Sequence, residues 1–178
     1  MPGLVLRIAK VADSQAILAL MRRSIEKLQS AYLTPAQLAS SQAAMGLDSR
    51  LIEDGTYFVI HDGPALVGCG GWSFRATLYG ANHGKNRDDR LLDPATERAK
   101  IRAMYTHPSH TKRGIGRMII DASERAARAR GFRSIEMAAS AAGKPFYMKC
   151  GYVVEREWLD ERTGREAVPL ALMSKALE

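Results

Sequence analysis

The segment from Met104 to Arg117, MYTHPSHTKRGIGR, constrains the possible folds of this chain more than any other part of it. It begins in a run typical of a β-strand, KIRAMYT at 100–106, and continues through a basic turn to two glycines. Apolar residues then recur at helical spacing, at Ile115, Ile119, Ala122, Ala126 and Ala129. A strand that leads through a turn into an amphipathic helix predicts a sheet with a helix packed against it.

The remaining periodicity extends this pattern over the whole chain. Strands are expected at 4–8, 56–60, 65–74, 100–106, 132–137, 152–158 and 168–173. Helices are expected from Asp13 or Ser14 to about Leu28, from Thr34-Pro35 to Ala44, and over 114–130 and 142–149. Because this order mixes hairpins with crossover helices, it predicts one α/β domain over 1–178, with a mixed sheet and helices on both faces.

Two local features refine this outline. Gly68, Gly70 and Gly71 are unusual inside a strand and predict either a bulge or the close approach of another group. The stretch from Gly80 to Pro94 is polar and rich in turn residues, and it predicts a long loop.

Composition excludes several classes of protein. Hydrophobic residues make up 46% of the 178 positions, which argues against global disorder. The two cysteines, Cys69 and Cys150, are too few for a disulfide-stapled fold, and we expect both to be reduced core residues. No apolar run is long enough to span a membrane, so we expect a soluble, cytoplasmic protein.

The formal charge of +7 favours an anionic partner, which could be nucleic acid, a membrane surface or a polyphosphate cofactor. Basic residues are scattered rather than gathered in a stripe with interleaved aromatics, so the sequence argues against nucleic-acid binding. At 112–117, by contrast, Lys112, Arg113 and Arg117 surround the two glycines at a helix start. A helix N-terminus presents unpaired N–H groups and a partial positive charge, so this position predicts a pyrophosphate cradle. A solvated glycine turn is the alternative.

Neither of two common phosphate-binding motifs fits this cradle. The P-loop string is absent, and in the dinucleotide fingerprint Ile119 would occupy the third glycine position. The string TKRGIG at 111–116 instead resembles motif A of the GCN5-related N-acetyltransferases. Downstream, PFYMKCGY at 145–152 resembles motif B of the same family, and the element order matches over nearly the whole chain.

The resemblance implies a GNAT-like domain with a mostly antiparallel sheet and acetyl-CoA as co-substrate, without a metal. It implies that the acetyl group passes to a primary amine by direct attack in a ternary complex, with Tyr147 as the general acid. The implied cofactor-binding residues are Met104, Tyr105, Thr106, Lys112, Arg113, Gly114, Ile115, Gly116, Arg117 and Ser140. A CoA sensor without catalysis is the alternative function, and a homodimer is possible.

The sequence defines the binding site of the amine acceptor and the general base less clearly. Trp72, Arg75 and Tyr79 end a strand that should face the acceptor cleft, and Arg75 could hold a carboxylate. The alternatives are packing for the two aromatic residues and a surface position for Arg75. The sequence departs from the family at Thr111, where Gln or Arg is usual, and at Ser140, where many members carry Asn. No acid lies in the 99–106 strand, so an acidic side chain such as Glu97, His83 in the long loop, or a water relay could serve as base.

The pair His107 and His110 has no partner at metal-ligand spacing, so we expect no metal site.

Overall fold

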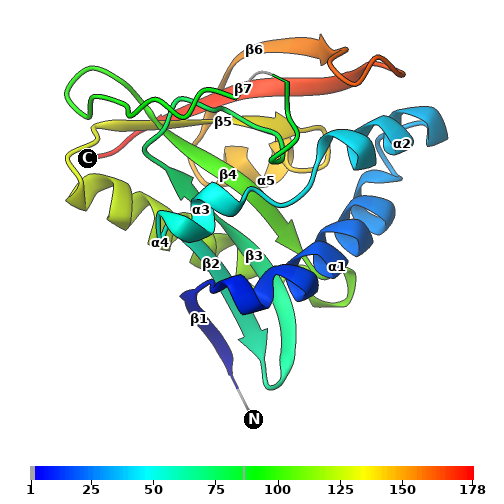
Figure 1. Cartoon of the computed structure of the whole chain (residues 1–178), viewed down its shortest axis with the longest axis horizontal. Helices are drawn as coiled ribbons and strands as arrows, with labels where there is room; N and C mark the ends of the chain where they lie inside the picture. Colours follow the sequence, from blue (N-terminus) through cyan, green and yellow to red (C-terminus); the bar gives the residue numbers. More distant parts are fainter. Residues whose placement is uncertain (1–2, 86) are drawn as a thin grey trace.

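The computed structural model describes residues 3–85 and 87–178; Met1, Pro2 and Asn86, the last within the predicted long loop, lie outside the described residues. The described residues form one seven-stranded sheet with the order β1-β2-β3-β4-β5-β7-β6 (Figure 1). Its strands are β1 Leu4–Ile8, β2 Tyr57–Asp62, β3 Ala65–Ser73, β4 Ala99–Thr106, β5 Ser134–Ser140, β6 Val153–Asp160 and β7 Val168–Ala176. Within the described ranges only β4 and β5 pair in parallel, which confirms the predicted mixed sheet.

Helices cover both faces of the sheet (Figure 1). α1 Ser14–Ser24, α2 Pro35–Ala44 and α3 Ser49–Glu53 lie on one face, and α4 Ile115–Ala129 and α5 Lys144–Lys149 lie on the other. The predicted helices are present within a few residues of their expected ends, whereas the short helix α3 was not predicted. No helix among the described residues combines the length and the apolar character that crossing a bilayer requires.

The first helix changes its hydrogen-bonding pattern towards its end. A π-helical turn, Ile25–Gln29, follows α1 directly. A π-helix bonds residue i to i+5, so its wider turn rotates the inward face relative to an α-helix. Gln29 is therefore buried, while Leu28, which the helical spacing had placed inward, is half-buried.

The core contains apolar residues from both faces of the sheet. Ile17 and Met21 of α1 pack on one face, and Ile119 and Ile120 of α4 pack on the other; all four are at most 2% exposed. Cys69 and Cys150 are free and buried, as predicted. Burial raises the pKa of the Cys69 thiol to about 12, which keeps it protonated and unreactive.

The glycines of β3 are explained by close approach, as predicted. A Cβ atom at Gly68 would lie 2.3 Å from Cγ2 of Ile115 on α4, and one at Gly71 would lie 2.1 Å from the Thr56 carbonyl oxygen. The β3–β4 register also shifts between Cys69 and Gly71. The missing side chain at Gly68 lets the start of α4 approach the sheet closely, and the one at Gly71 makes room for the backbone of Thr56.

The two central strands diverge soon after they meet. β4 and β5 pair only at Ala99–Ile135 and Lys100–Glu136, and beyond this point they separate like the sides of a V, with α5 seen between them (Figure 1). At the closed end, Lys100 Nζ contacts Glu136 Oε1 at 2.5 Å. Above it, Ala103 has a left-handed φ of 48°, and its carbonyl oxygen accepts a 2.7 Å hydrogen bond from the Tyr57 hydroxyl. The resulting bulge directs β4 away from β5.

We predict that Gly68→Ala destabilises the fold by about 1–3 kcal/mol, because the new methyl group overlaps the buried side chain of Ile115. Gly3→Ala is a matched control, since its Cβ would meet nothing within 4 Å. Urea unfolding of both variants measures the effect. Equal stability of the two variants would show that α4 can shift to accommodate a side chain at position 68.

Candidate active site

A cavity of about 70 Å³ lies where β4 and β5 diverge. β4 and β5 supply part of its wall, and Tyr147 of α5 closes it from one face of the sheet. The other side is formed by the end of the first helical segment, the chain after α2 and the long loop. The lining residues are Gln29, Met45, Gly46, Leu78, Tyr79, Gly80, Ile101, Arg102, Ala103, Met104, Tyr105, Met137, Ala138, Ser140 and Tyr147. The cavity thus brings together five predicted site residues: Tyr79, Met104, Tyr105, Ser140 and Tyr147.

Tyr147 is held by its neighbours through ring contacts. Its ring lies edge-on to Phe146 at 5.2 Å and to Tyr152 at 6.1 Å between centroids. A Cβ atom at Gly143 would lie 2.8 Å from Tyr147 Cε2, so the glycine makes room for the ring. No described residue hydrogen-bonds the hydroxyl. Burial raises the pKa of the Tyr147 phenol above its usual value, and Cys150 adds to the effect, so the group stays protonated at neutral pH.

Ser140 ends β5 and belongs to both the cavity and a turn. Its Oγ accepts a hydrogen bond from the Gly143 amide at 3.2 Å. A larger hollow of about 460 Å³, bounded by the β6–β7 hairpin and the start of α5, shares Ser140 with the cavity. An ion pair between Lys144 and Glu157 borders this hollow, but Ser140 is its only predicted site residue among the described residues. We therefore place the candidate site in the smaller cavity.

The N-terminus of α4 has the geometry of an anion site. Gly114 has φ +85° and precedes the helix, and a Cβ atom on it would meet nothing within 4 Å, so this face is open. Within the described ranges, no protein acceptor takes the backbone N–H groups from Lys112 to Arg117. The Ile115 side chain is buried in the core, so only its N–H group can reach a ligand. Unpaired N–H groups at a helix start favour phosphate.

The contacts of Gly116 and of the nearby cations differ from those that the sequence predicted. A Cβ atom at Gly116 would lie 2.8 Å from Cζ of Phe146, so this glycine makes room for a protein side chain rather than for a ligand. Arg113 is ion-paired with Asp62 at 2.8 Å, and Arg117 donates to the Lys149 carbonyl at 3.3 Å. The Lys112 ammonium has no ion-pair partner among the described residues.

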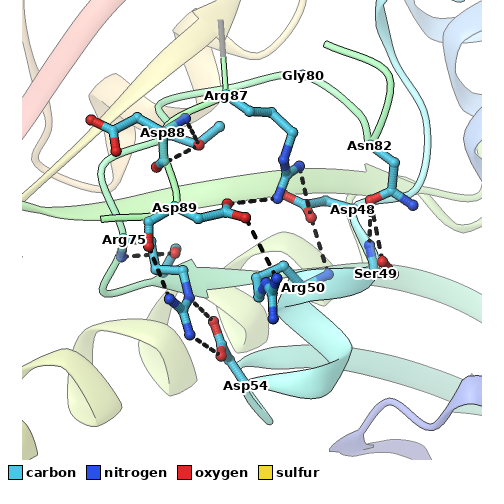
Figure 2. A network of polar contacts seen from close by, with 12 residues as sticks. Asp48, Ser49, Arg50, Asp54, Arg75, Gly80, Asn82, Arg87, Asp88 and Asp89 are labelled. Atoms are coloured by element: carbon cyan, nitrogen blue, oxygen red, sulfur yellow. Dashed lines mark hydrogen bonds and ion pairs between the residues drawn. The ribbon is translucent and has the colours of Figure 1, made fainter. Parts of the chain in front are cut away.

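Trp72 and Arg75 are predicted substrate residues that do not line the cavity. Trp72 is 4% exposed and packs edge-on against Phe74 and Phe132 in the core. Arg75 donates from Nε and Nη2 to both carboxylate oxygens of Asp54, at 2.7 and 2.8 Å, so it is not free to bind a substrate carboxylate (Figure 2). The prediction placed both at the end of β3, but that end points into the core and towards α3. Thr106, at the end of β4, does not line the cavity either.

The long loop is held against the sheet by a polar network (Figure 2). Its centre is Asp48, which is 2% exposed and lies between Arg102 of β4, at 2.9 Å, and Arg87 of the loop, at 3.0 Å. Arg102 also donates to the carbonyl oxygens of Thr77 and Gly80. One buried guanidinium therefore fixes the part of the loop that carries Tyr79.

Tyr79 connects the loop to the β6–β7 hairpin. The Arg162 guanidinium lies 3.6 Å from the centroid of its ring, and Trp158 of β6 lies 6.0 Å away between centroids. His83 does not line the cavity; its Nε2 lies 3.0 Å from the Ala43 carbonyl oxygen, next to Gly46, so its role stays a prediction. Glu97 is half-buried and accepts hydrogen bonds from Arg90, which lower the pKa of its carboxyl to about 2, and it does not line the cavity either.

Among the cavity residues that sequence reasoning missed, two carry polar side chains. Gln29 and Arg102 both line it, and both are less than 10% exposed. A charged residue in the middle of the KIRAMYT strand was an available signal for Arg102, since a buried charge needs a partner. His107 and His110 share the Ser109 hydroxyl, and no group of three or more potential ligands among the described residues could hold a metal ion.

Comparison with known proteins identifies this arrangement. The sequence profile of the acetyltransferase (GNAT) family matches residues 21–152, well over half of the chain. The chain belongs to the GNAT family. This GNAT match includes the bulged strand, the open helix start and the tyrosine of α5. No curated protein matches the sequence at a significant level.

Solved structures show the same GNAT fold at low sequence identity. The GCN5-related N-acetyltransferase from Rhodopseudomonas palustris has a TM-score of 0.72 and 23% identity, covering 99% of this chain and 98% of its own. PaiA N-acetyltransferase from Thermoplasma acidophilum, solved with coenzyme A, has a TM-score of 0.67 and 14% identity, and the match covers 98% of this chain and 99% of the PaiA chain. YncA from Salmonella typhimurium, solved with its cofactor acetyl-CoA, has a TM-score of 0.63 and 17% identity, and the match covers 98% of this chain and 94% of the YncA chain.

We predict that Arg102→Leu destabilises this GNAT domain by about 3 kcal/mol, because it leaves Asp48 buried with only Arg87 as a partner. Arg90→Leu, which removes an exposed pair with Glu97, is the control and should change stability little. Chemical unfolding gives the stabilities, and limited proteolysis should cut the 74–98 loop faster only in the Arg102 variant. Similar behaviour of the two variants would contradict the role assigned to Arg102.

Proposed function

We propose that this chain transfers an acetyl group from acetyl-CoA to a primary amine, which attacks directly in a ternary complex. One observation carries the proposal: the phenol of Tyr147 borders a cavity between diverging parallel strands, and the same sheet positions an open helix N-terminus. Membership of the GNAT family, and the CoA and acetyl-CoA present in two structures of this fold, support it.

The chain can hold the two ends of acetyl-CoA in different ways. The backbone N–H groups from Lys112 to Arg117 would bind the pyrophosphate, aided by the helix dipole and by the charge of Lys112. The backbone of Met104 and Thr106 lies on the edge of β4 that β5 leaves unpaired, and it would bind the amides of the pantetheine arm. Tyr105 and Ser140 flank the same opening. When bound, acetyl-CoA supplies an activated thioester.

Tyr147 would donate its phenolic proton to the departing sulfur. A general acid must remain protonated until the bond breaks, and the raised pKa of the half-buried Tyr147 phenol ensures this over the usual assay range. The sign of the shift means that loss of the proton, and of activity with it, begins only above the ordinary tyrosine range. A falling limb in the rate near neutral pH would therefore have another origin.

The attacking amine must be in its neutral form, not the ammonium form, when it reacts. Among the described residues that line the cavity there is no carboxylate and no imidazole. Of the bases considered from the sequence, this favours release of the proton to water over Glu97 or His83. The rate at low amine concentration should accordingly rise with pH up to the pKa of the amine itself, since only the neutral form is nucleophilic.

The missing base also gives some support to a second function, a sensor that binds acyl-CoA without catalysis. The retained tyrosine argues for the enzyme. Release of free thiol from acetyl-CoA in the presence of a panel of amines distinguishes the two functions. Cofactor binding with no amine-dependent thiol release would favour the sensor.

The phosphate cradle is tested by Gly114→Asp. The carboxylate would stand where the pyrophosphate is proposed to bind, and we expect acetyl-CoA binding at least about 10-fold weaker by calorimetry. Gly164→Asp is a matched control, because this glycine also has a positive φ, +66°, and nothing within 4 Å of its Cβ position. Equal affinity in the two variants would place the phosphate site elsewhere.

The acid is tested by Tyr147→Phe, which keeps the ring and its contacts with Phe146 and Tyr152. The turnover number should fall by ~10²–10⁴-fold, while the affinity for acetyl-CoA hardly changes. Steady-state kinetics and calorimetry give the two quantities. Nearly full turnover would make Tyr147 a packing residue, and loss of cofactor binding would make its hydroxyl a positioning group.

A further inference from the structure

Gln29 is the polar side chain of the cavity wall that the proposed chemistry does not use. It ends the π-helical turn Ile25–Gln29, is only 8% exposed and lines the cavity. Its Oε1 accepts a 2.7 Å hydrogen bond from the Ser41 hydroxyl. Its amide nitrogen, with two N–H donors, has no hydrogen-bond partner among the described residues.

Contacts of its main chain and of its amide oxygen position Gln29. The backbone carbonyl of Gln29 accepts from the N–H groups of Tyr32 and Leu33, at 2.9 and 3.1 Å, which holds the residue in the turn. Ser41 is 2% exposed and donates to the amide oxygen. Because the oxygen is engaged, the nitrogen is the group left to face the cavity. Because this accessible donor has no partner among the described residues, it is available to a ligand that accepts hydrogen bonds.

The remaining wall limits what that ligand can be. The other lining side chains are mainly apolar or aromatic, and none is acidic. Arg102 is the cation among the lining residues, and its contacts go to Asp48 and to two loop carbonyls. A polyamine needs carboxylates for its further ammonium groups, which this wall does not offer. The cavity volume of about 70 Å³ admits only a small group.

We propose that the Gln29 amide binds an oxygen of the acceptor, and that the acceptors are compact primary amines carrying a carbonyl or carboxylate oxygen near the nitrogen. This inference rests on the proposed acetyl transfer and names the substrate class of the same site. Gln29 acts as a specificity-determining residue: it orients the amine in the cavity and takes no part in proton transfer. An amine without such an oxygen leaves the amide unpaired and binds more weakly.

The test compares Gln29→Leu, which removes the donor at similar volume, with Gln42→Leu on the exposed side of α2. The probes are alaninamide, alanine and isopropylamine, and thiol release gives kcat/KM. We expect Gln29→Leu to lower kcat/KM roughly 10-fold for the oxygen-bearing probes and less than about twofold for isopropylamine. The KM for acetyl-CoA and all values for Gln42→Leu should stay unchanged. Comparing alaninamide with alanine in the parent protein distinguishes an amide oxygen from a carboxylate.

A second variant distinguishes loss of the donor from loss of folding. Gln29→Glu keeps the shape and the bond from Ser41 but replaces the donor with a carboxylate, so it should reject alanine and gain activity with spermidine. An equal loss for all three probes in Gln29→Leu, at an unchanged melting temperature, would overturn the inference. So would acetylation of other amines by the parent protein but none of the oxygen-bearing probes.

Calorimetric titration of alaninamide into the CoA-saturated protein separates the inference from the proposed function. Binding that weakens about 10-fold in Gln29→Leu supports the inference even if no thiol is released, in which case acetyl transfer itself fails. Thiol release with alaninamide that is insensitive to residue 29 would leave acetyl transfer standing and overturn the role of Gln29.

Discussion

A parallel strand pair that ends after two register positions leaves one edge of a central strand without partners, and the site depends on this interruption. Two polar contacts stabilise the divergence of β4 from β5. The contact between Lys100 and Glu136 fixes the closed end of the V, and the Tyr57 hydroxyl stabilises the left-handed turn at Ala103 that bends β4 away. Unpaired backbone inside a protein is costly, so a divergence of this kind persists most readily where a ligand completes the hydrogen bonding.

The two sides of the cavity are built by different kinds of interaction. The side of α4 and α5 is apolar and closely packed, with glycines where side chains would collide. The opposite side is a loop with little regular structure, and its position depends on a buried arginine, its carboxylate partner and main-chain carbonyl groups. Such a network is directional and less tolerant of substitution than an apolar contact. The side proposed to hold the cofactor is thus formed by regular structure, and the side proposed to hold the acceptor by specific polar contacts.

Sequence patterns predicted the fold well because the strands and helices carry strong periodicity and recognisable ends, as at Thr34-Pro35. Close approach at the β3 glycines was also predictable, since glycine inside a strand requires a reason. Trp72 and Arg75 were misplaced because alternation along a strand does not tell which face is core once a bulge intervenes. Gln29 was missed because a π-helical turn rotates the helix by an amount that no α-helical spacing reveals, and the Arg102–Asp48 pair joins segments 54 residues apart.

The contact between Gly116 and Phe146 couples the two motifs sterically. The first turn of α4 and the helix that carries Tyr147 pack so closely that the ring of Phe146 occupies the place of a side chain at residue 116. A mutation to any larger residue at that point would be felt at the reacting end of the cavity as well as at the helix start. Drift in one motif is therefore restrained by the other, while the loop and the turn after α1 can change with far less consequence for the cofactor. Under the proposed function, this scaffold can exchange one amine acceptor for another without a change in how it holds the acyl donor.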